Sequence, residues 1–93
     1  MSDEKREHIR LPFDAPLQLQ IAGKASWIEG KCSNMSAGGI LVETAAPIAI
    51  DTELQVQLKD QPEKYQAYGH VIRLVEDENS FLIAVKYKDL ATH

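Results

Sequence analysis

The residues best suited to hold a polar ligand form the segment 34–39, Asn-Met-Ser-Ala-Gly-Gly. Asparagine and serine supply short hydrogen-bond donors and acceptors, and glycine lets a backbone come close because it has no Cβ. We predict that this segment is a turn between two strands. Residues of these types are also ordinary strand connectors, so the segment alone leaves both interpretations open.

A second polar cluster lies near the N-terminus, where Arg6 and Arg10 stand four residues apart. Guanidinium groups match phosphate oxygens through paired hydrogen bonds, so two arginines can hold a phosphate ligand even on an acidic protein. Pro12 disfavours helix at the residue before it. We therefore expect residues 1–12 to be a flexible arm that orders on binding, with a solvated charged tail as the alternative.

Composition excludes several classes of protein. The chain has 93 residues, which predicts a single domain, and its net charge of −4 argues against binding long nucleic acid. No apolar run is long enough to span a membrane, and the N-terminus lacks the apolar segment of a signal peptide. With Cys32 as its one cysteine, the chain has no internal disulfide. We expect a cytoplasmic protein without membrane insertion, and Cys32 as a small buried hydrophobic residue.

Short strands dominate the expected secondary structure. Apolar and polar residues alternate over 17–21 and 54–58, which is typical of half-buried strands. Further strands are expected at about 25–33, 40–44, 65–75 and 81–87, with turns or loops at 22–24, 45–51, 59–64 and 76–79. Gly69 is expected to be a bulge or bend. Residues 88–93 can form at most one helical turn. This pattern indicates a small antiparallel barrel or sandwich, and a closed barrel would leave no exposed edges.

The two faces of the strand expected at 25–33 differ in chemistry. Alternation places Ile28, Gly30 and Cys32 on one face and Trp27, Glu29, Lys31 and Ser33 on the other. We expect Trp27 to cover one end of a barrel, and a ligand-stacking platform is the alternative.

Catalytic and metal-binding patterns are weak. His8, His70 and His93 do not have the spacing of metal ligands, and nothing around Ser36 resembles a nucleophile elbow. The paired glycines lack the lysine and helix that follow in a phosphate-binding loop. We expect no enzyme, no metal and no cofactor. His70 and Arg73 are expected on a strand surface, where Arg73 could also support an anionic ligand.

Taken together, the two clusters resemble the PilZ domain, a bacterial receptor module for cyclic di-GMP. The family pattern is R-x-x-x-R followed by D/N-x-S-x-x-G, and this chain has Arg6-x-x-x-Arg10 followed by Asn34-x-Ser36-x-x-Gly39. The flanking segments 11–17 and 38–44 are also similar, so the resemblance covers nearly the whole chain. Four features depart from the usual pattern. Asn34 takes the place of the commoner aspartate, and the position before the arginine pair holds Lys5 rather than another arginine. The closing strand ends in residues 84–87, Ala-Val-Lys-Tyr, where Gly-Val and Phe are more usual, and the C-terminus is too short for the longer helix of many members.

The resemblance implies an all-β fold, a six-stranded antiparallel barrel of residues 13–93, with the arm of residues 1–12 wrapping the ligand against its wall. It implies cyclic di-GMP contacts from Arg6, Arg10, Asn34, Ser36 and Gly39. Candidates for secondary contacts are Lys5, Ala37, Gly38 and Arg73.

The function implied is a receptor or adaptor whose arm changes conformation on binding. It would signal to an unidentified effector protein in motility, adhesion or exopolysaccharide control, and a ligand-dependent dimer is one candidate arrangement. The alternative is a protein-interaction barrel that works without nucleotide. A small oligonucleotide-binding barrel ranks last, because aromatic residues make up only 6% of an acidic chain.

Overall fold

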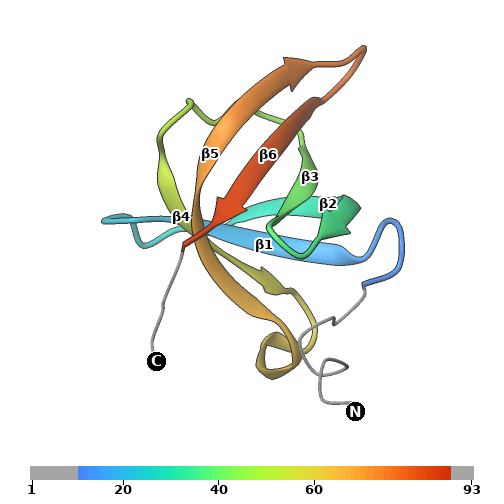
Figure 1. The fold of residues 1–93 in the computed structure, drawn as a ribbon, viewed down its shortest axis with the longest axis vertical. Coiled ribbons are helices and arrows are strands. Elements are labelled where there is room, and N and C mark those ends of the chain that lie inside the picture. Colours follow the sequence, from blue (N-terminus) through green and yellow to red (C-terminus); the bar gives the residue numbers. More distant parts are fainter. Residues whose placement is uncertain (1–10, 89–93) are drawn as a thin grey trace.

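The computed structural model describes residues 11–88, which form a closed barrel of six antiparallel strands (Figure 1). The strands are β1 (Pro16–Ile21), β2 (Ile28–Ser36), β3 (Gly39–Thr44), β4 (Glu53–Leu58), β5 (Gln66–Glu76) and β6 (Phe81–Tyr87), and a 3-10 turn, η2 (Pro62–Lys64), joins β4 to β5. Their order around the barrel is β1-β2-β3-β6-β5-β4, and β4 pairs back with β1. The prediction of a six-stranded antiparallel barrel is confirmed.

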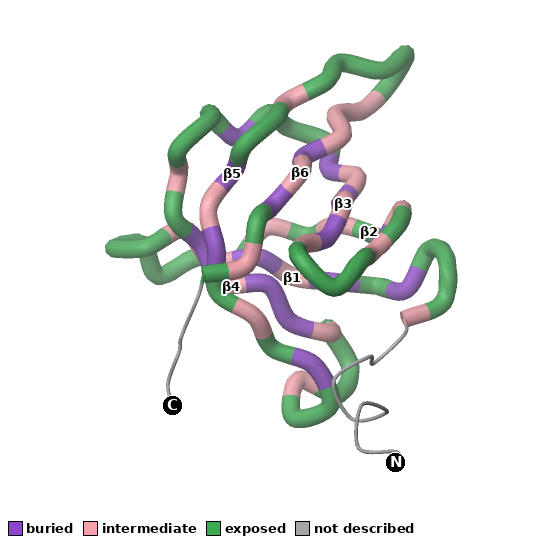
Figure 2. The backbone as a smooth tube through the Cα atoms, in the orientation of Figure 1, coloured by how far each residue is buried: buried purple, intermediate pink, exposed green. Residues whose placement is uncertain are grey.

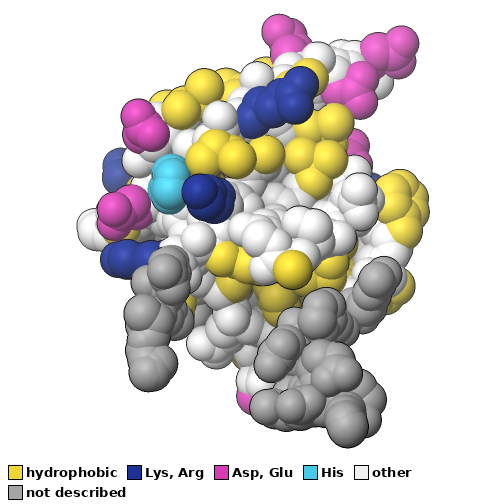
Figure 3. Space-filling view, viewed as in Figure 1, with side chains coloured by type: hydrophobic (Ala, Val, Ile, Leu, Met, Phe, Trp, Pro, Cys, Tyr) yellow, Lys and Arg dark blue, Asp and Glu magenta, His cyan; other side chains and the backbone are white. Residues whose placement is uncertain are grey.

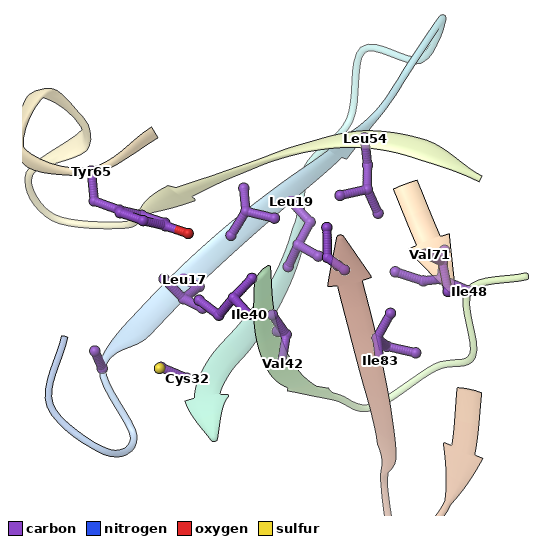
Figure 4. Packing of buried hydrophobic residues seen from close by; sticks show 13 residues of the cluster. Leu17, Leu19, Cys32, Ile40, Val42, Ile48, Leu54, Tyr65, Val71 and Ile83 are labelled. Carbon is purple, nitrogen blue, oxygen red and sulfur yellow. The ribbon is translucent and has the colours of Figure 1, made fainter. Parts of the chain in front are cut away.

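Buried residues alternate with more exposed ones along the strands (Figure 2), and apolar side chains fill the inside of the barrel (Figure 4). Leu17 and Leu19 of β1, Val56 of β4 and Ile83 of β6 have no exposed surface. Burying one such side chain fully contributes about 1.5–3 kcal/mol. Cys32 is 1% exposed and belongs to the same cluster, which confirms its expected role as a buried hydrophobic residue.

Two β-bulges interrupt the ladders. Between β2 and β3 the register passes from Cys32 opposite Val42 to Asn34 opposite Leu41, which leaves Ser33 as the extra residue. Between β5 and β6 a similar shift leaves Ile72 as the extra residue.

Gly69 was expected to be a bulge or a bend, and the bulge part of this prediction is wrong. Gly69 pairs in register with Tyr87, three positions before the true bulge. Its lack of a side chain serves close strand approach instead, because a Cβ at this position would overlap the Lys86 carbonyl oxygen.

The bounds of most predicted strands and turns are confirmed to within a residue or two. The exception is the strand expected at 25–33. That strand starts and ends later, as β2, and it includes Asn34, Met35 and Ser36. The predicted turn over 34–39 is therefore wrong in its extent, because only Ala37 and Gly38 connect β2 to β3. Trp27 precedes β2, is 39% exposed and lies outside the core cluster.

Some predictions concern the two ends of the chain and lie outside the described residues. These are most of the N-terminal arm, with Lys5, Arg6 and Arg10, and the C-terminal helical turn beyond Lys88. Within residues 11–88, no helix is long and apolar enough to cross a membrane.

Candidate functional site

The bulge at Ser33 decides which way the polar residues of β2 point. Cys32 is buried, so strict alternation along the strand would also turn Asn34 and Ser36 into the barrel. The extra residue reverses the alternation: Asn34 and Ser36 are exposed, and the half-buried Met35 packs against the core. The bulge therefore presents the amide and the hydroxyl on the outer wall.

The Asn34 and Ser36 side chains each keep hydrogen-bonding capacity. The Asn34 Oδ1 accepts a hydrogen bond from the Met35 N–H at 2.8 Å, which orients the amide. Within the described part of the chain, the Asn34 Nδ2 donates to no other group. The Ser36 hydroxyl donates to the Gly39 carbonyl over 3.5 Å, a long and weak bond. A ligand can therefore engage the amide nitrogen and the hydroxyl at little cost.

Gly39 is required by the packing of the barrel itself. It opens β3 and lies opposite Lys86 of β6. A Cβ at position 39 would overlap the Val85 carbonyl oxygen and lie 3.3 Å from the Lys86 Cα. Nothing lies within 4 Å of a Cβ built on Gly38, which stands open at the tip of the hairpin. Close approach of β6 to β3 is thus sufficient to explain glycine at 39, whether or not a ligand is bound.

Asn34, Ser36 and both glycines border a shallow depression of about 460 Å³ on the outer wall. It extends from the β2–β3 hairpin across β6 to the bulge of β5. The remaining side chains around it are Met35, Ile40, Leu41, Ile72, Ala84, Val85 and Lys86. The depression therefore combines a mostly apolar floor with a few polar groups at one end, which is typical of small-molecule sites.

The described chain begins beside this depression. The backbone N–H of Leu11 donates to the Met35 Sδ at 3.4 Å, and Leu11 packs against the core cluster. Asp14 and Ala15 extend the pairing with β2, since the Asp14 N–H donates to the Cys32 carbonyl at 2.7 Å and the Cys32 N–H donates to Ala15 at 2.9 Å. The segment that enters β1 thus runs along the strand that carries Asn34 and Ser36.

The residues predicted to make secondary ligand contacts do not all lie at the depression. Gly38 borders the depression, whereas Ala37 and Arg73 do not. Arg73 is exposed on β5 and lies opposite Ala84. The predicted Lys5, Arg6 and Arg10 lie outside the described residues.

Sequence reasoning missed Lys86, Leu41, Ala84 and Ile72 as residues around the depression. In a strand over 81–87, neighbouring side chains point to opposite faces, so Lys86 lies on the face opposite to that of the buried Val85. It does not reveal that β6 pairs with β3, because the two strands lie far apart in the sequence.

Other chemistry finds little support in the described residues. Within residues 11–88, no group of three or more His, Cys, Asp or Glu side chains could hold a metal ion. Two further depressions, of about 280 and 390 Å³, lie at other parts of the wall and do not include Asn34 or Ser36.

An antiparallel barrel with an exposed amide and hydroxyl beside an apolar floor has the features of a binding module for a small polar ligand. The family model of the PilZ domain matches residues 4–93, nearly the whole chain. The chain therefore belongs to the PilZ domain family, as its resemblance predicted. PilZ domains are receptor modules for cyclic di-GMP and act as binding or adaptor units rather than enzymes. A search of curated proteins finds no significant match.

Proposed function

We propose that this chain is a non-catalytic receptor for cyclic di-GMP, which binds on the outer wall at Asn34 and Ser36 and is enclosed by the arginine pair of residues 1–12. The observation that carries the proposal is the contact of the Leu11 N–H with the Sδ of Met35, the strand residue that separates Asn34 from Ser36 in the sequence. Membership of the PilZ family supports the class of ligand.

Chain length alone keeps both arginines near this site. Arg10 is the residue before Leu11, and Arg6 stands five residues before it. An extended chain spans at most about 3.3–3.6 Å per residue, so the Arg6 backbone is tethered within about 18 Å of Leu11. A ligand seated over Asn34 and Ser36 is therefore within reach of both guanidinium groups.

The chemistry of the ligand matches these groups. Cyclic di-GMP carries two phosphates and two guanine bases, and guanidinium can both pair with phosphate oxygens and stack on a purine. The Asn34 amide and the Ser36 hydroxyl can hydrogen-bond base edges or phosphate oxygens. The apolar floor with Leu41 and Ala84 suits the flat face of a base.

Ordering of residues 1–12 over the ligand gives a small barrel a means to signal. The ordered segment and the ligand form a surface that the free protein lacks, and an effector protein that prefers this surface shifts the equilibrium toward it. Motility, adhesion or exopolysaccharide output would then be the regulated process. A ligand-dependent dimer would be a second form of the same response.

The test is calorimetric titration of the full chain with cyclic di-GMP, alongside Arg10→Ala and Ser36→Ala. Loss of a charge-assisted bond at Arg10 should cost about 1.5–3 kcal/mol, or about ten-fold or more in affinity. Lys24→Ala serves as a matched control, because Lys24 is an exposed cation in the turn between β1 and β2 and does not border the depression. Absence of binding by the wild type would overturn the proposal and favour the nucleotide-independent interaction barrel.

A further inference from the structure

We infer that Lys86 is an additional cationic contact of the nucleotide site, and that its side chain enters the site across Gly39. This inference rests on the proposed function, because it concerns the same ligand. It assigns a role to a residue on the last strand of the barrel, far in sequence from both polar clusters.

The composition of the depression carries the first step. Among the described residues that border it, Lys86 is the one with a charged side chain. Asn34 and Ser36 stand at the same depression, and apolar residues such as Leu41 and Ile72 form its floor. A ligand with two phosphates that settles over this floor therefore lies next to the cationic side chain that borders the depression, Lys86.

The register of the strands carries the second step. Ser36 pairs with Gly39 across the β2–β3 hairpin, and Gly39 pairs with Lys86 across β3 and β6. Three residues therefore form one row of the wall, and two strand spacings of about 4.8 Å separate the backbones of Ser36 and Lys86. Because Gly39 has no side chain, the flexible four-carbon stem of the lysine meets no side chain in this row before Ser36.

The charge of Lys86 is available to a ligand. Among the described residues the ion pair formed is between Lys59 and Glu29, so Lys86 is not paired with a described carboxylate. On the neighbouring strand β5, the residue that pairs with Lys86 is His70 and not a carboxylate. Figure 3 shows basic side chains next to hydrophobic ones on this face of an otherwise acidic molecule.

The expected role of Lys86 differs from that of the arginines. An ammonium group is a compact charge without the planar fork of guanidinium, so it attracts a phosphate oxygen without stacking on a base. Because Lys86 belongs to a strand that is paired on both sides, its backbone is already in place in the free barrel.

The experiment compares calorimetric titrations of the full chain with cyclic di-GMP for the wild type, Lys86→Gln and Lys86→Arg. Lys31→Gln is the matched control, since Lys31 is also an exposed strand lysine but does not border this depression. We expect Lys86→Gln to weaken binding about three- to ten-fold and to make the affinity less sensitive to salt, because a phosphate contact is lost. Lys86→Arg should retain most of the affinity, and Lys31→Gln should leave it unchanged.

The outcomes separate this inference from the proposed function. If the wild type binds and Lys86→Gln binds equally well with the same salt dependence, the role of Lys86 is overturned while the proposed function stands. Equal weakening by Lys86→Gln and Lys31→Gln would also overturn it, because the effect would then be one of net charge. If the wild type itself does not bind, the proposed function fails and this inference fails with it. Thermal unfolding of each variant checks that the barrel is intact.

Discussion

Asn34 of β2 and Arg73 of β5 lie in one row of the barrel wall, connected through Leu41 of β3 and Ala84 of β6. Each of the two residues directly follows a bulge, at Ser33 and at Ile72. A bulge reverses the inward and outward alternation beyond it. Both polar side chains are exposed for this reason, although the buried residues two positions earlier would otherwise predict that they point inward.

Deletion of Ser33 tests whether the bulge itself is needed. Without the extra residue, Asn34 directly follows Cys32 and pairs with Leu41 in a regular ladder, so Asn34 and Ser36 stay exposed and Met35 stays turned inward. We therefore expect the deletion variant to stay folded in urea unfolding, because no polar group enters the core. Ser33→Ala keeps the bulge and should change stability by no more than about 0.5 kcal/mol. Complete unfolding of the deletion variant would show that the pairing of β2 with β3 requires the bulge.

The two glycines of the hairpin should differ sharply in their tolerance of a methyl group. Gly39→Ala places a Cβ against the Val85 carbonyl oxygen, so a strand must shift, and we expect a loss of about 1–3 kcal/mol in the free energy of unfolding. Gly38→Ala places a Cβ in open space and should be nearly neutral. Denaturant unfolding of the two variants measures the difference, and equal stability would show that β6 yields without cost.

The pair of buried Tyr65 and half-buried Tyr87 predicts a loss of stability at alkaline pH. The Tyr65 and Tyr87 hydroxyls lie 2.6 Å apart. Burial raises the pKa of Tyr65 far above its usual value, and the bond with Tyr87 raises it further. Burial also raises the pKa of Tyr87, against an opposing effect of the bond with Tyr65.

Because both folded-state pKa values exceed the unfolded value of about 10, the contribution of the pair is complete below that pH. It is lost as the pH rises further, since the unfolded chain ionises first. Urea unfolding on either side of pH ~10 should show this loss in the wild type and a smaller one in the double variant Tyr65→Phe/Tyr87→Phe. Parallel pH profiles for the two proteins would assign the effect to other groups.

The thiol of Cys32 should be unreactive in the folded protein. The residue is 1% exposed, and burial raises the pKa of its thiol, while a hydrogen bond from the Asn34 backbone opposes this to a lesser degree. The thiolate is the reactive form and needs access to reagent. Thiol labelling should therefore be slow under native conditions and fast in concentrated urea. Rapid native labelling would indicate that the β2 wall opens beside the candidate site.

Local sequence patterns were sufficient to predict most of the strands. Alternation over 17–21 and 54–58 reflects side chains that face the core and the solvent in turn, so those strands could be predicted from residue order. The spacing of Asn34, Ser36 and Gly39, together with the arginine pair, was sufficient to indicate the family that the whole-chain match confirms. The ligand contacts of those residues stay predictions.

Only the tertiary structure decided which side chains share a surface. A bulge is an irregularity of pairing between two strands, so the positions of Ser33 and Ile72 depend on partners that local sequence does not name. For the same reason Gly69 was mistaken for a bulge, although its small size serves the close approach of β6. The pairing of β3 with β6 brings Lys86 beside Gly39, and such a contact between distant segments follows from closure of the barrel.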